Sequence, residues 1–74
     1  MPSHLHLLKP DAPPLAAAVI EADARAPGAV VTVVLLDRAV APALPPGVRV
    51  LTQEALGSAG LLDLIFESDR IVTW

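Results

Sequence analysis

The sequence contains no cysteine. The chain therefore has no disulfide, no thiolate ligand for a metal and no sulfur nucleophile or sulfur carrier of its own. Aromatic residues are nearly absent too, since Phe66 and Trp74 are the only two. Two isolated rings indicate core or contact positions rather than a platform on which bases could stack.

Positive charge is also scarce. The chain has 5 Lys+Arg against 8 Asp+Glu, and its formal net charge is -3. The cations are scattered along the sequence, at Lys9, Arg25, Arg38, Arg49 and Arg70. Because nucleic-acid binding needs cations gathered on one surface, we expect no direct contact with nucleic acid.

Long apolar runs are missing as well. The longest, AVVTVVLL at 29–36, falls far short of the roughly 20 residues that a membrane-spanning helix needs. The opening MPSHLHLLKP lacks the basic region and long apolar stretch of a signal peptide. These features predict a cytoplasmic protein without membrane contact.

Motifs for catalysis or cofactor binding are not found. The segment KPDAPP at 9–14 has no glycine-rich phosphate loop, and neither Ser3 nor Ser58 lies in a G-x-S-x-G context. We therefore expect no cofactor and no enzymatic activity.

What the sequence does contain is apolar residues, which make up 54% of its 74 positions. This composition predicts a single folded domain over 1–74. A domain of this size buries only about 60% of the surface of its unfolded chain, so it is marginally stable alone.

Strand-like and helix-like segments alternate along the chain. Apolar, β-branched runs predict strands, and alanine-rich segments bounded by proline or glycine predict helices. The expected strands are 4–9, 29–37, 48–52 and 70–74, and the expected helices lie within 12–26 and 53–68. We expect Asp11 to cap the first helix, whose buried face would carry Leu15, Val19 and Ala22, and glycines to interrupt the second at Gly57 and Gly60.

The segment 29–37 is apolar at both odd and even positions, which indicates a strand buried on both faces in a parallel sheet. The predicted fold is a small α/β domain with a mostly parallel sheet of three to four strands and two main helices. Two helices and a short turn are too few elements to cover both faces of this sheet. We therefore expect one apolar face of the sheet to drive self-association or binding of a partner.

Four charged residues follow the first two expected strands: Lys9, Asp11, Asp37 and Arg38. Ligands of open parallel sheets bind at the carboxyl edge of the strands, so this cluster is a candidate site for a small anion or a partner. The alternative, which we favour, is that these residues only terminate strands and cap helices.

His4 and His6 form an H-x-H pair whose side chains share one face of the first strand. Such a pair could begin a zinc site with Asp11 or Asp37 as further ligands, although no cysteine or third histidine is present. We favour polar residues on a partly exposed strand face, and expect no metal.

The final strand ends in the sole tryptophan, and an apolar ring beside a fraying terminus indicates that something holds it in place. The sequence leaves two roles for Trp74, packing in the core of the domain or contact with a partner at an interface. The candidate interface residues are Trp74, Phe66 and Ile71.

Several motifs together resemble the TusB/DsrH family, the smallest subunit of DsrE-type sulfur-relay complexes. Leu5-His6-Leu7-Leu8 matches a Leu-His-x-Leu opening strand, and LLDRAV at 35–40 matches a second strand that ends in an acidic residue. VRVLTQEALGSAGL at 48–61 and LLDLIFESDRIVTW at 61–74 resemble the family's later strand, helix and terminal Trp. The chain departs from the family in lacking one strand and turn before the final helix, and the cysteine that many members carry after the second strand.

The resemblance implies a flavodoxin-like, DsrE-like three-layer domain that assembles with itself or with TusC- and TusD-like (DsrE- and DsrF-like) subunits. Those complexes pass persulfide sulfur toward 2-thiouridine in tRNA or in sulfur oxidation. Without cysteine, this chain would be a non-catalytic, assembly-forming subunit. The alternative is a small homo-oligomeric ligand- or anion-binding domain.

Overall fold

The computed structural model describes residues 2–74. Its strands are β1 (Ser3–Leu8), β2 (Val30–Leu35), β3 (Arg49–Thr52) and β4 (Arg70–Thr73), and its helices are α1 (Pro14–Ala24) and α2 (Gln53–Glu67). The strands form one sheet in the order β3-β2-β1-β4, and every neighbouring pair is parallel. The predicted α/β class with a parallel sheet and two helices is confirmed.

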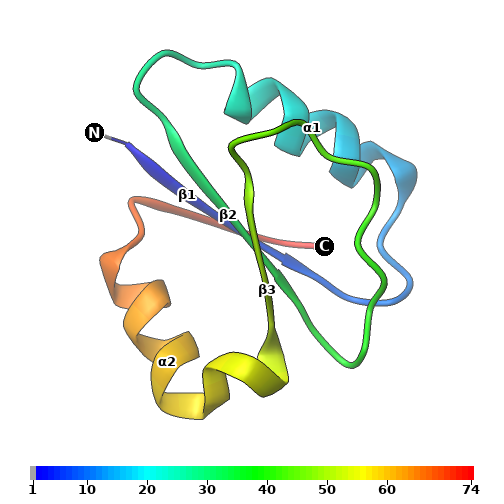
Figure 1. Ribbon diagram of the computed structural model, residues 1–74, viewed down its shortest axis with the longest axis vertical. Helices are drawn as coiled ribbons and strands as arrows, with labels where there is room; N and C mark the ends of the chain where they lie inside the picture. Colours follow the sequence, from blue (N-terminus) through cyan, green and yellow to red (C-terminus); the bar gives the residue numbers. More distant parts are fainter. Residues whose placement is uncertain (1) are drawn as a thin grey trace.

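The molecule has three layers, with α1 and α2 on opposite faces of the sheet (Figure 1). The chain passes from β1 through α1 to β2, and the loop 36–48 continues to β3 on the α1 side, where Leu44 and Val48 pack against the core. Then α2 returns across the other face and places β4 beside β1. Strands β2 and β3 are thus added on one side of β1, and β4 is added on the other side. The carboxyl ends of β1 and β4, where this order reverses, form the topological switch point of the sheet.

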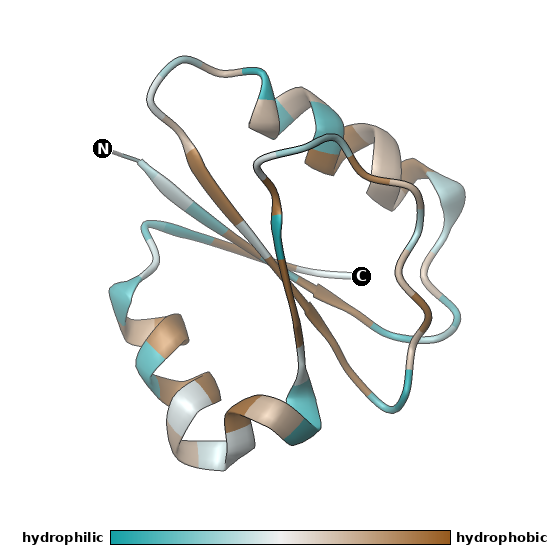
Figure 2. Cartoon of the chain, viewed as in Figure 1, coloured by the Kyte–Doolittle hydropathy of each residue, from teal (hydrophilic) through white to brown (hydrophobic). Residues whose placement is uncertain are grey.

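Strand β2 is the apolar centre of the domain. Residues 31–35 are all buried, with Val31, Val33 and Leu35 in the core cluster under α1. Figure 2 shows the apolar residues concentrated along the strands. The expected open face over this strand is not found, because the loop 36–48 completes the α1 layer and α2 covers the other side.

Helix α1 lies within the expected segment 12–26 and begins at Pro14, two residues after the start of that segment. Its N-cap is Pro13, with no side-chain capping bond, and Asp11 lies instead in a turn that the Ala12 N–H closes by donating to the Lys9 carbonyl. The prediction of an Asp11 cap was therefore wrong.

The buried face of α1 also differs from the expected one. Ala16 and Ile20 are buried, whereas Leu15 is 61% exposed. A shift of one residue turns a helix by about 100°, so an alanine-rich helix gives little contrast between neighbouring faces. The small Ala16 side chain lets the helix backbone approach the sheet.

Helix α2 packs more loosely, and none of its residues is fully buried. Thr52 caps it by accepting a hydrogen bond from the Ala55 N–H at 3.2 Å. At Gly57 the backbone has φ 67° and ψ 174°, a conformation that is essentially restricted to glycine. The predicted interruption at Gly57 is confirmed, but at Gly60 the helix continues without a break.

Candidate functional site

The four charged residues predicted at the strand ends lie at that edge, as expected. Lys9 follows β1, and Asp37 and Arg38 follow β2 in a left-handed turn with φ 51° and 61°. The Asp37 backbone N–H donates to the side-chain oxygen of Gln53 at 3.2 Å, which ties this turn to the start of α2.

The structure does not assemble these four residues into one site. A hollow of about 170 Å³ lies beside the end of β1, and Lys9 is its only charged lining residue. Within residues 2–74 no hydrogen bond or ion pair joins any two of the four side chains. An anion in this hollow would therefore meet a single cation.

The start of α1 adds little to anion binding at this hollow. Pro13 and Pro14 have no backbone N–H, and the Ala16 N–H already donates to the Pro13 carbonyl at 2.9 Å. A helix N-terminus binds anions through free N–H groups, and most of them are missing or used here.

His6 is a polar residue that is fully buried on β1 beneath α1. Its Nε2 lies 2.8 Å from the Asp23 carboxylate, and the Trp74 indole N–H donates to its Nδ1 at 3.1 Å. Because an indole N–H can only donate, Nδ1 must be unprotonated. His6 is therefore the neutral tautomer with its proton on Nε2, donated to Asp23.

Trp74 is fixed by its backbone as well as its ring. Its N–H donates to the Leu7 carbonyl at 2.9 Å, and its ring lies beside that of His6, with centroids 6.3 Å apart and planes inclined by only 14°. The indole is half-buried against the α1-side core. The chain's own core thus holds Trp74, and its polar N–H is already used.

The other two candidate interface residues are accessible. Phe66 is 78% exposed and Ile71 41% exposed, so both could contact a second protein. Their role at an interface stays a prediction.

His4 and His6 share the α1 face of β1, as predicted, since they are paired in register with Val31 and Val33. His4 Nδ1 is buried without a hydrogen-bond partner in the described chain and lies 3.9 Å from the Asp23 carboxylate. The expectation of a partly exposed face was wrong for His6, because its side chain is fully buried against Asp23 of α1 and the Trp74 indole.

The two further ligands considered for zinc lie elsewhere. Asp11 and Asp37 are in turns at the carboxyl edge of the sheet rather than under α1. Among residues 2–74 no group of three or more His, Asp or Glu side chains is arranged to hold a metal ion.

Asp23 was not predicted as a functional residue, although the sequence carries a signal for it. It follows Ile20 by three positions, so the two share a helix face, and Ile20 is fully buried. An acidic residue on the buried face of a helix needs a partner, and a histidine on the strand below can supply one.

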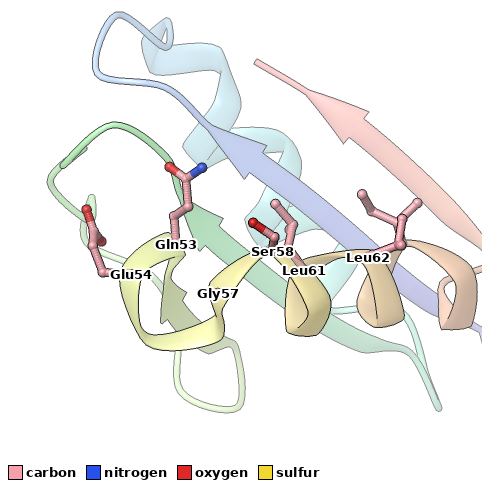
Figure 3. A pocket seen from close by; sticks show the side chains of 7 residues that line it. Gln53, Glu54, Gly57, Ser58, Leu61 and Leu62 are labelled. Atoms are coloured by element: carbon pink, nitrogen blue, oxygen red, sulfur yellow. The ribbon is translucent and has the colours of Figure 1, made fainter.

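A second hollow, of about 290 Å³, lies on α2 and is lined entirely by that helix, at Gln53, Glu54, Gly57, Ser58, Leu61, Leu62 and Ile65. Figure 3 shows Gln53, Ser58, Leu61 and Leu62 rising from the same side of the kinked helix. Its lining is polar at the N-terminal end and apolar beyond Ser58.

No helix within residues 2–74 has the length and apolar character needed to cross a membrane. Compared with known proteins, the chain matches no family model, no curated protein and no solved structure.

Proposed function

We propose that the chain is a cytoplasmic, non-catalytic, assembly-forming subunit of a sulfur-relay complex, in the role that TusB/DsrH subunits have. The observation that carries this proposal is the contact between His6 and Trp74. These residues belong to the two ends of the resemblance, the Leu-His-x-Leu strand and the terminal pattern that ends in Trp. Two motifs that resemble the family and that contact each other in the structure support a common fold better than either motif alone.

The architecture suits a scaffold. Both edge strands, β3 and β4, have one side without a partner strand in the described chain, and such edges are sites where another protein can add a strand. The His6–Trp74 contact holds β4 against β1, so this edge is presented in a fixed position. Ile71 on β4 is partly exposed there.

The sulfur chemistry itself would belong to the neighbouring subunits. With no cysteine in the chain, a persulfide cannot form on it. Its contribution would be to hold and orient the subunits that carry the reactive thiols.

Co-expression with DsrE-type subunits tests this proposal. Light scattering should give one species whose mass equals a sum of both chains, and that species should persist on dilution through gel filtration. A folded chain that elutes alone in the presence of these subunits would contradict the proposal.

A further inference from the structure

The outer surface of α2 combines a hollow with exposed large apolar side chains. We call this surface the α2 face and define it by Gly57, Ser58, Leu61, Leu62, Ile65 and Phe66. Leu62 is 52% exposed and Phe66 78% exposed, and the hollow beside them measures about 290 Å³. Large apolar side chains beside a hollow are typical of a surface that another protein covers.

The charged residues of helix α2 all have one sign. Helix α2 carries the carboxylates of Glu54, Asp63 and Glu67, and no Lys or Arg lies in 53–67. Helix α1 differs, because its Glu21 is paired with Arg25. The electrostatic complement of the α2 face is therefore an apolar surface with a basic rim.

The same charges argue against two other occupants. A second copy of this chain, paired through its own α2, would bring two sets of carboxylates into one interface, and like charges at an interface weaken binding. An anionic lipid surface would be repelled for the same reason, since membrane binding of this kind depends on Lys and Arg.

We propose that the α2 face is a docking site for an amphipathic helix of a partner protein, with a large apolar side chain in the hollow and Lys or Arg along the rim. A helix that lies in an apolar groove is a common mode of recognition. The proposal rests on the proposed function, since it names the chemistry of a neighbouring subunit in the assembly.

Two matched helical peptides test the proposal with the full chain. Both carry the same apolar stripe of Leu and Phe, and they differ only in having Lys or Glu on either side of it. The Lys peptide should bind and shift the backbone amide signals of residues 53–66 in NMR spectra. The Glu peptide should bind at least about tenfold more weakly in fluorescence anisotropy.

Two substitutions of exposed leucines locate the site. Leu62→Asp should weaken binding of the Lys peptide by about tenfold or more, because it places a charge at the hollow. Leu15→Asp is the matched control, since Leu15 is similarly exposed but lies on α1. It should leave the affinity unchanged, and circular dichroism should show both variants folded.

Several outcomes would overturn the proposal: no binding of either peptide, equal binding of both, signals that shift outside 53–66, or equal losses in the two variants. Self-association that Leu62→Asp abolishes would assign the face to a second copy instead. If Leu62→Asp still co-assembles fully with DsrE-type subunits, the docking proposal fails while the proposed function stands. If the Lys peptide binds as expected but no such assembly forms, only the proposed function fails.

Discussion

The two faces of the sheet are covered in different ways. Under α1, Ala16 and Ile20 are buried against β1 and β2, and the buried His6 has both ring nitrogens hydrogen-bonded. Over the opposite face, α2 is kinked and has no fully buried residue. The comparison indicates that the α1 layer supplies most of the stability, whereas the α2 layer is free to present a surface.

The largest expected effect comes from Ile20→Ala in the α1 layer. Because Ile20 is fully buried, we expect its truncation to lower the free energy of unfolding by about 3 kcal/mol. Leu62→Ala in α2 should cost no more than about 0.5 kcal/mol. Urea unfolding followed by circular dichroism measures both losses. Equal losses would contradict the conclusion that the α1 layer supplies most of the stability.

His6→Ala should have the next largest effect. It removes the partner of both the Asp23 carboxylate and the Trp74 N–H, and we expect a loss of about 2.5 kcal/mol. Trp74 is the only tryptophan, so a red shift of its emission would report release of the ring. An unchanged emission maximum would show that packing alone fixes Trp74.

The kink of α2 gives a smaller effect and a control within the same helix. An added Cβ meets no atom within 4 Å at Gly57, but the backbone there has positive φ, so Gly57→Ala should destabilise by about 1.5 kcal/mol through strain. Gly60 lies in regular helix, and Gly60→Ala should be neutral or slightly stabilising. Thermal unfolding of both variants measures the difference, and equal midpoints would contradict the assigned kink.

The smallest effect isolates a single hydrogen bond. Trp74→Phe keeps an aromatic ring beside His6 but removes the indole N–H, and we expect a loss of about 1 kcal/mol. Urea unfolding monitored by circular dichroism gives the value. A loss as large as that of His6→Ala would mean that the bulk of the indole, rather than its hydrogen bond, is the main contribution.

The fold was predictable where the residue pattern is local and strong. The β-branched run at 30–35 and the strand at 70–73 have the expected type and position. Helix α1 was predicted with the wrong buried face, because its alanines offer almost no amphipathic contrast. Which face a strand or helix buries depends on the sheet beneath it, and the strand order is not encoded locally.

The candidate site was harder to predict for the same reason. The four charges at the strand ends were placed correctly, but only Lys9 lines a hollow. The partners of His6 lie 17 and 68 positions away along the chain. Such contacts become visible only once β4 is known to lie beside β1.

The position of β4 also has a consequence for synthesis of the protein. Strand β1 is made before the other strands of this domain, but the strand on one of its sides, β4, is the last of the four to be made. Until then an apolar strand edge and the His6 ring lack their cover, and an unpaired edge can pair with other nascent chains. The sheet can therefore be completed only after β4 has been made.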